Sequence, residues 1–244
     1  MNAEATHPLV PSLSKDAGRC PGVTQVGMDL EILFEDAEAL VIDKPAGLPL
    51  DRPRAGGDSL DNHLDALKLG FLRSPVPVHR LDRDTSGCLL LARNPKALRR
   101  FAAAFEERLV EKRYLGVVGG EVAEEEGTIA LSLSKVSTAH NGWRMIPARK
   151  GKPAVTRWRK LDAREGLTLV EFRPETGRTH QIRVHAASGL GAALLGDPVY
   201  GSGRGAGRTM LHAAGLIVPR GEKAPITAAS PLPADFIALG FADE

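Results

Sequence analysis

The densest group of chemically capable side chains lies in one short loop. Residues 79–87 read His-Arg-Leu-Asp-Arg-Asp-Thr-Ser-Gly and are flanked by the apolar runs VPV and CLLLA. The arginines beside Asp82 and Asp84 would keep these carboxylates ionised, and an ionised carboxylate can act as a nucleophile. The residues alone leave a second interpretation open, because Asp, Thr, Ser and Gly are also common in structural turns.

The same loop permits a competing assignment. The order Asp82-Arg83-Asp84-Thr85-Ser86 is similar to the DxDx(T/V) segment of haloacid-dehalogenase-type phosphatases. The fifth position is Ser instead of Thr or Val, and the preceding strand is not a continuous apolar run. No later acidic pair in a glycine-rich loop offers magnesium ligands, so a phosphatase is the least favoured alternative.

Short strands with few helices would position this loop. Because the strands do not alternate strictly with helices, the pattern indicates an α+β domain. Apolar runs predict strands at residues 30–35, 39–43, 76–81, 88–93, 113–118, 128–133, 154–161, 167–172 and 210–218.

Three segments have the pattern of helices, each with a capping residue followed by apolar positions on one face. The last of these helices is expected to end at Gly189, because glycine commonly follows a helix. Given as the cap and then the apolar face, the segments are Ser59 with Leu60, Leu64 and Leu67; Asn94, before Pro95, with Leu98, Phe101, Ala102 and Phe105; and Thr179 with Ile182 and Ala186.

The organisation of the chain is simple. Residues 1–28 are rich in Pro, Gly and Ser without an apolar period, which predicts a flexible N-terminal tail, and residues 29–244 are expected to form one domain. We find no secretory signal, and no apolar run approaches the roughly 20 residues that span a bilayer. Cys20 and Cys88 support neither a disulfide framework nor a thiolate metal site. We expect a cytoplasmic monomer with no membrane partner.

Charge is unevenly distributed along the chain. The formal net charge is only +2, but residues 93–160 contain 15 Lys and Arg against 7 Glu and no Asp. A basic segment in a nearly neutral protein fits a surface that follows phosphates, and Arg99 and Arg100 are candidates for it. An ordinary solvated face with long charged side chains would give the same count.

Several longer motifs carry a family resemblance. HRLDRDTSGCLLLA resembles the central motif of the RluA-type RNA pseudouridine synthases, H-R-L-D-x-x-T-S-G followed by apolar residues. The family's first motif is similar to VIDKPAGL, its lysine-x-tyrosine strand to KRYLGVVGG, and its arginine motif to ETGRTHQIRVH. The two family motifs that follow match GDPVYG and LHAAGL. The resemblance covers nearly all of residues 30–219. It implies an α+β pseudouridine-synthase-type catalytic domain at residues 29–244, with a mixed, largely antiparallel central sheet flanked by helices.

The resemblance also implies a reaction. A uridine in structured ribosomal or transfer RNA would be isomerised to pseudouridine, as the bond from ribose C1′ to N1 breaks and a bond to C5 forms. Asp82 would be the nucleophile, Tyr114 would stack on the target uracil, and Arg183 would pair with Asp82. Asp82 could add to C1′, abstract the C2′ hydrogen or add to uracil C6, and the sequence does not choose. No redox change occurs, so no cofactor and no metal are expected.

Further residues are assigned to substrate contact. Arg80 occupies the position of an arginine that helps to extrude the target base, which an enzyme cannot reach inside a helix. Lys112, Arg113 and Arg178 are expected to contact phosphates. The remaining expected substrate contacts are His79, Lys44, Thr85, His180 and Leu211.

The sequence departs from the family pattern at residues 191–193, where Gly-Ala-Ala replaces a usual His-Pro pair with about one extra residue. Many relatives also carry a separate RNA-binding domain before the catalytic one, and we expect RNA recognition here to rest on the catalytic domain. A non-catalytic RNA-binding protein on the same scaffold is the main alternative. Binding alone does not require Asp82, Tyr114 and Arg183 together, which favours the enzyme.

We predict that isomerase activity survives dialysis against a strong chelator with no nucleotide or reductant added, because the reaction needs no Lewis acid. The measurement is pseudouridine formation before and after dialysis. Restoration of lost activity by zinc or magnesium, under conditions in which the RNA stays folded, would contradict this prediction.

Overall fold

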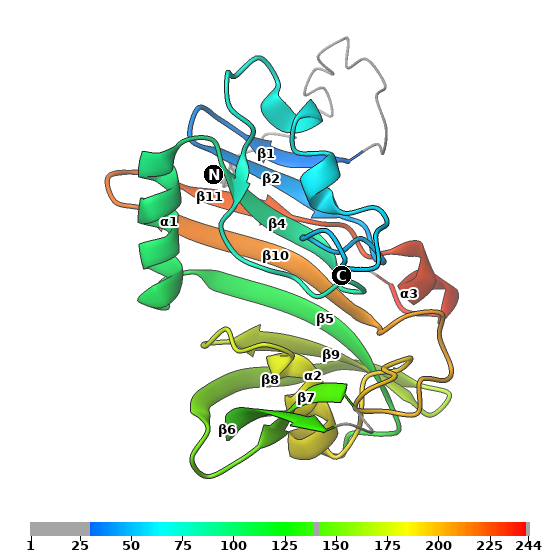
Figure 1. The fold of residues 1–244 in the computed structure, drawn as a ribbon. Helices are drawn as coiled ribbons and strands as arrows, with labels where there is room; N and C mark the ends of the chain where they lie inside the picture. The colour runs from blue at the N-terminus through cyan, green and yellow to red at the C-terminus, as the bar shows by residue number, and fades with distance from the viewer. Residues whose placement is uncertain (1–29, 139–141, 243–244) are drawn as a thin grey trace, which may run out of the picture.

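The computed structural model describes residues 30–138 and 142–242 (Figure 1), so the predicted tail at residues 1–28 lies outside the described residues. The helical elements are η1 (Leu60–Asn62), η2 (Ala66–Lys68), α1 (Pro95–Glu106), α2 (Gln181–His185), η3 (Ala186–Leu190) and α3 (Ala234–Ala238). The strands are β1 (Ile32–Glu35), β2 (Ala39–Lys44), β3 (Val76–Pro77), β4 (Ser86–Ala92), β5 (Glu111–Gly119), β6 (Glu126–Thr138), β7 (Gly142–Pro147), β8 (Lys152–Arg164), β9 (Leu167–Pro174), β10 (Leu211–Arg220) and β11 (Lys223–Ala229).

All of these strands join one sheet, in the order β1-β2-β4-β10-β5-β9-β8-β6-β7, with β11 also paired to β10 and β3 to β4. Only β4 and β10 pair in parallel among the described strands. The predicted α+β fold with a mixed, largely antiparallel sheet is therefore confirmed. The sheet has two halves (Figure 1): a first half with α1 on β4 and β10, and a second half of β6 to β9 with α2, joined through β5.

Strand β4 explains why the first half has two cores. Every residue of β4 is buried, and side chains alternate between the faces of a strand. Cys88 and Leu90 enter one core with Phe101 of α1, whereas Leu89 and Leu91 enter a second core beside η1 and η2. A strand that is covered on both faces reads as a continuous apolar run, as CLLLA does.

Helix α1 begins as the sequence predicts. The Asn94 side chain accepts a hydrogen bond from the Ala97 amide at 2.8 Å, and Pro95 occupies the first helical position. Ala97, Phe101 and Ala104 are its buried residues. The cap and the apolar face together fix α1 against β4 and β10.

Two other helix predictions are wrong in detail. Residues 60–68 form two short 3₁₀ turns instead of one helix, and Ser59 makes no side-chain cap. The last predicted helix corresponds to α2, which starts after His180. His180 takes a left-handed φ of 52°, so Thr179 is not the cap of this helix. It continues through the π-helical turn η3, which ends at Leu190 and is capped by Gly191 with a φ of 71°, so the helix passes the predicted stop at Gly189.

The predicted strand at residues 76–81 is confined to β3, Val76–Pro77. The reason is local. The His79 imidazole accepts the Leu90 amide hydrogen bond at 3.0 Å, so a side chain takes the place of a strand carbonyl. Residues 79–85 thus leave the sheet as a loop. The sequence did not predict β7, β11 or α3.

The basic segment at residues 93–160 does not form one face. It runs from α1 in the first half to β6, β7 and β8 in the second (Figure 1). Several of its cations are already paired: Arg93 with Glu35 at 2.5 Å and Arg100 with Glu38 at 2.8 Å. Its positive charge is therefore divided between the two halves of the sheet and partly balanced by nearby glutamates.

Gly87 follows the chemically dense loop and offers a test of the sheet. Its φ is +105°, and a Cβ there would lie 2.3 Å from the Ala213 carbonyl oxygen of the parallel strand β10. We predict that Gly87→Ala lowers the free energy of unfolding by about 3 kcal/mol, as strained backbone and overpacking do. Urea unfolding followed by circular dichroism measures the change. The control is Gly119→Ala, where a Cβ meets no atom within 4 Å and should cost less than about 1 kcal/mol. Equal losses at both positions would refute the steric explanation.

Candidate active site

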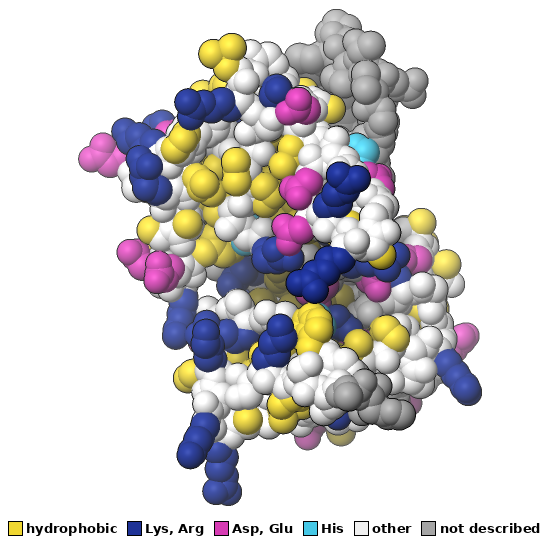
Figure 2. Space-filling model, viewed as in Figure 1, with side chains coloured by type: hydrophobic (Ala, Val, Ile, Leu, Met, Phe, Trp, Pro, Cys, Tyr) yellow, Lys and Arg dark blue, Asp and Glu magenta, His cyan; other side chains and the backbone are white. Residues whose placement is uncertain are grey.

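A cleft of about 600 Å³ lies between the two halves of the sheet. Figure 2 shows Lys and Arg side chains gathered along the hollow that crosses the middle of this face. The residues that line the cleft come from loop 79–85, the end of α1, strand β5 and residues 174–183. Ten of the predicted site residues line it: His79, Arg80, Asp82, Thr85, Lys112, Tyr114, Arg178, His180, Arg183 and Leu211.

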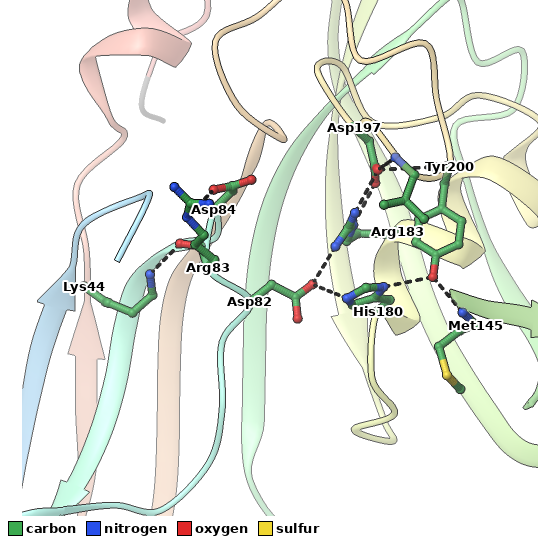
Figure 3. Close-up of polar contacts among 10 residues, drawn as sticks. Lys44, Asp82, Arg83, Asp84, Met145, His180, Arg183, Asp197 and Tyr200 are labelled. Carbon is green, nitrogen blue, oxygen red and sulfur yellow. Dashed lines mark hydrogen bonds and ion pairs between the residues drawn. The ribbon is translucent and has the colours of Figure 1, made fainter. Parts of the chain in front are cut away.

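Arg183 connects two carboxylates (Figure 3). Its Nη1 donates to Asp82 Oδ2 at 3.3 Å, so the predicted ion pair is present. A stronger, bidentate contact is to Asp197, with Nε and Nη2 at 2.7 and 2.8 Å from its two oxygens. Asp197 is fully buried, and its Oδ1 also accepts the amides of Val199 and Tyr200 at 2.8 and 3.1 Å.

The charges of this pair are stabilised by one another. Burial alone would lower the pKa of Arg183, but the hydrogen bonds and charge of Asp197 outweigh it, and the pKa is raised. Burial alone would raise the pKa of Asp197, but Arg183 and the two amides lower it. Both groups therefore stay charged at neutral pH, and Arg183 presents a fixed positive charge to Asp82.

His180 lies on the other side of Asp82. Its Nε2 is 3.8 Å from Asp82 Oδ2, and its Nδ1 is hydrogen bonded to the Tyr200 hydroxyl at 2.9 Å. That hydroxyl accepts the Met145 amide at 2.9 Å, which ties the site to β7 (Figure 3). Burial lowers the pKa of His180, with Asp82 opposing and Arg183 adding to the effect.

Lys44 does not contact the cleft. Its side chain is fully buried, and its ammonium group donates to the carbonyls of Pro45 and Leu48 at 2.7 and 2.9 Å. Its third donor reaches the Arg83 carbonyl at 3.0 Å, which also accepts the Gly47 amide at 2.9 Å. Burial lowers the pKa of Lys44 to about 8. The prediction of a substrate contact is wrong here: all three donors are used to fix the loop that follows Asp82.

Arg208 holds the same loop from a second direction. Its Nη1 donates to the Asp84 carbonyl at 3.0 Å, while Nε and Nη2 bind Asp235 at 2.6 and 3.0 Å. Within the loop, the Thr85 amide donates to the Asp82 carbonyl at 3.1 Å and closes a turn. The position of Asp82 is therefore set by backbone contacts, while its carboxylate faces the cleft.

Tyr114 and Lys112 lie two residues apart on β5 and thus on the same face, toward the cleft. The Tyr114 ring packs between the apolar clusters of the two halves. Burial raises the pKa of Tyr114, and the charge of Asp82 adds to this, so the phenol stays protonated. Burial lowers the pKa of Lys112.

His79 forms an aromatic wall of the cleft with Phe105, their ring centroids 4.7 Å apart. Burial, and then the charge of Lys112, lower the pKa of His79 to about 4, so it is neutral at neutral pH. Arg80, next along the chain, is exposed and donates to Asp51 at 2.6 Å. An exposed ion pair contributes at most about 1 kcal/mol, so a ligand can displace Asp51.

Gln181 shapes the loop that carries Arg178 and His180. Its Oε1 accepts from the Thr176 hydroxyl at 2.7 Å and the Arg178 amide at 2.9 Å. Its Nε2 donates to the Val155 carbonyl of β8 at 3.0 Å. This buried amide fastens the loop that contains His180 to the second half of the sheet.

Sequence reasoning missed Asp197, Tyr200, Gln181 and Phe105 as parts of the site. A signal existed for the first two, because both belong to the GDPVYG motif, and an arginine as buried as Arg183 needs a carboxylate. Gln181 likewise lies inside ETGRTHQIRVH. Phe105 was predicted only as part of the apolar face of α1.

In residues 30–138 and 142–242, no three His, Cys, Asp or Glu side chains are grouped so that they could hold a metal ion. Among the helices of the same residues, none is long and apolar enough to cross a membrane.

Solved structures of similar fold define the class. Human RNA Pseudouridylate Synthase Domain Containing 1 superposes with a TM-score of 0.70 at 31% identity, covering 86% of this chain and 87% of that one. Human RNA Pseudouridylate Synthase Domain Containing 4 gives 0.71 at 25% identity, covering 85% and 90%. The fold is that of a pseudouridylate synthase domain.

Sequence relatives narrow the class to a family. A family model described as RNA pseudouridylate synthase matches residues 38–188. An uncharacterized RNA pseudouridine synthase of Zymomonas mobilis is 55% identical over 86% of this chain and 97% of its own length. The ribosomal large subunit pseudouridine synthase D of that organism is 38% identical over 75% of this chain and 59% of its own length. The chain belongs to the RluA-type RNA pseudouridylate synthase family, whose members are isomerases.

The buried ion pair generates a prediction. Asp197→Asn leaves the Arg183 charge without its main partner, so we expect the free energy of unfolding to fall by about 3 kcal/mol, together with a loss of activity. Because the pKa of Asp197 is lowered in the fold, its stabilisation is present above its unfolded pKa of about 4 and is lost as pH falls through the folded pKa. The difference between wild type and variant should therefore shrink at acidic pH.

Urea unfolding at several pH values measures this difference. The control is Asp235→Asn, which removes a more exposed partner of Arg208 and should cost less than about 1 kcal/mol. A loss at Asp197 no larger than that at Asp235 would show that the buried pair is not required.

Proposed function

We propose that this enzyme converts uridine in RNA to pseudouridine with Asp82 as its nucleophile. The observation that carries the proposal is the position of the Asp82 carboxylate, in the cleft and 3.3 Å from a permanently charged Arg183. Arg183 sets a positive charge beside this carboxylate, whose oxygen would act as the nucleophile. The negatively charged oxygen thus lies in a cleft large enough to take a nucleoside.

The isomerisation needs a bond exchange without redox change. The bond between ribose C1′ and N1 breaks, the uracil turns, and a bond from C1′ to C5 forms. C5 loses its proton and N1 gains one, so the product is an isomer of the substrate. Asp82 could start the sequence by attack on C1′, as in retaining glycosidases, by abstraction of the C2′ hydrogen, or by addition to uracil C6. All three routes need the same ionised carboxylate.

Tyr114 is proposed to hold the uracil by stacking. Its ring is in the cleft, and its raised pKa keeps the phenol neutral, so the residue offers an aromatic surface and not a general base at neutral pH. Base–aromatic stacking is worth about 1–3 kcal/mol. His180 and Leu211 complete the proposed contacts to the nucleoside, with Thr85 beside Asp82.

The target base must leave its helix or loop to reach Asp82. We propose that Arg80 assists by contacting the RNA where the base departs. Arg80 is exposed beside the cleft, and the ion pair that it makes with Asp51 is weak enough to be exchanged for RNA. Lys112 and Arg178, which also line the cleft, are proposed phosphate contacts, and the neutral His79 is a further proposed contact to the substrate.

The proposed substrate is a uridine in structured ribosomal or transfer RNA. Ribosomal RNA is the first to test, because relatives 38–40% identical are named ribosomal large subunit pseudouridine synthase D. Comparison of pseudouridines in RNA from cells with and without the gene would identify the position. A cytoplasmic location and a monomeric state stay predictions.

The central prediction concerns Asp82. Asp82→Asn should reduce pseudouridine formation by more than about 10³-fold, or roughly 4 kcal/mol of transition-state stabilisation, because an amide is a poor nucleophile. RNA affinity should stay near that of the wild type. Single-turnover assays and RNA-binding titrations measure the two quantities.

Asp84→Asn is the matched control, since it makes the same change two residues away in the same loop. Asp84 does not line the cleft, and Arg208 binds its backbone carbonyl and not its carboxylate. Its activity should stay within a few-fold of wild type. Activity of Asp82→Asn within tenfold of wild type would remove Asp82 from the mechanism.

A further inference from the structure

Trp143 is an exposed aromatic side chain next to the proposed active site. It lies on β7 and is 45% exposed. Its ring lies against that of His180 in a tilted arrangement, with centroids 4.9 Å apart and planes inclined by 30°. His180 in turn lines the cleft, and its Nε2 is 3.8 Å from the Asp82 carboxylate. Only one side chain therefore separates the Trp143 ring from the reactive oxygen.

The position of Trp143 is not explained by core packing. The chain has two tryptophans, and the other, Trp158, is 8% exposed in the core of the second half. Met145, two residues after Trp143 and on the same face of β7, is buried with Leu133 and Val184. Trp143 lies on the same face of β7 but outside this core, and nearly half of the residue is exposed.

A cation accompanies the ring. The ammonium group of Lys135, on the neighbouring strand β6, lies 4.8 Å from the centroid of Trp143, and Lys135 is itself exposed. An aromatic surface beside a solvated cation is the arrangement that binds single-stranded nucleic acid, because the base stacks and the phosphate meets the charge.

We propose that Trp143 and Lys135 bind an unpaired nucleotide that neighbours the target uridine, with the base on Trp143 and the phosphate at Lys135. The inference rests on the proposed function, since it requires RNA in the cleft. Every base has a π face, so this site tolerates any base but requires an unpaired one. It would make the enzyme select the single-stranded surroundings of the uridine and not their sequence.

Tryptophan emission tests this directly. The full-length Asp82→Asn chain, which should bind without turnover, is titrated with a short oligouridylate and with a ribose-phosphate oligomer of equal length that lacks bases. Stacking on Trp143 should quench emission with the oligouridylate and not with the abasic oligomer. The buried Trp158 supplies a constant background, which the Trp143→Phe variant measures alone.

Affinity gives the second readout. In the Asp82→Asn background, Trp143→Ala should weaken oligouridylate binding by about 5- to 100-fold, measured by anisotropy of labelled RNA, and leave abasic binding unchanged. Trp143→Phe should recover much of the affinity because its ring can stack. Phe71→Ala is the control: it removes another exposed aromatic, 39% exposed in the first half of the molecule, and should change neither affinity.

Each contrary outcome is informative. If Trp143→Ala weakens both oligomers equally, Trp143 only supports His180, and the proposal is overturned. It is also overturned if emission is not quenched, or if oligouridylate does not bind, because stacking needs no particular sequence. The proposed function fails separately, if the wild-type chain forms no pseudouridine in ribosomal or transfer RNA from cells that lack the gene.

Discussion

The buried, bidentate pair between Arg183 and Asp197 is the contact on which the site depends. An arginine as buried as Arg183 is tolerated only with a partner, and Asp197 supplies two hydrogen bonds below 3 Å. The longer contact to Asp82, at 3.3 Å, uses a donor that Asp197 leaves available. Asp197 thus offsets the free-energy cost of burying the Arg183 charge. Asp82 gains a positively charged neighbour whose position is already fixed by Asp197.

Asp82 is held in place through the backbone of the residues that follow it, while its carboxylate faces the cleft. Lys44 and Arg208 bind backbone carbonyls of Arg83 and Asp84, so the chain that follows Asp82 is held through groups that do not react. A site that must hold an atom within a fraction of an ångström gains from such support, because loop side chains alone are mobile. Burial of the Lys44 ammonium group disfavours its charged form, and the pKa of Lys44 is lowered for this reason.

The sequence predicted the fold well where burial is strong. The continuous run of β4 and the cap of α1 are local signals, whereas β7 and β11 are not: each buries few side chains, Met145 in β7 and Ile226 and Ala228 in β11. In the site, motif resemblance identified the important positions but not their surroundings. It placed Lys44 in contact with substrate because a motif does not state whether a side chain is buried. Motif resemblance did not predict the ion pair between Arg183 and Asp197, because spacing along the chain does not show which carboxylate lies next to a given arginine.

The division of the site between the halves of the sheet has a consequence for how activity is acquired. Asp82 comes from the first half and Arg183 from the second, and the two residues are 101 positions apart in the chain. A contact between such distant residues closes a large loop, and the loss of chain entropy must be overcome before the contact stabilises the fold. Sheets that are built from such contacts fold slowly. Catalytic competence therefore belongs to the complete fold. A refolding chain that has formed only one half would carry either a carboxylate without its counter-charge or a counter-charge without its carboxylate, and recovery of turnover would report the final step of assembly.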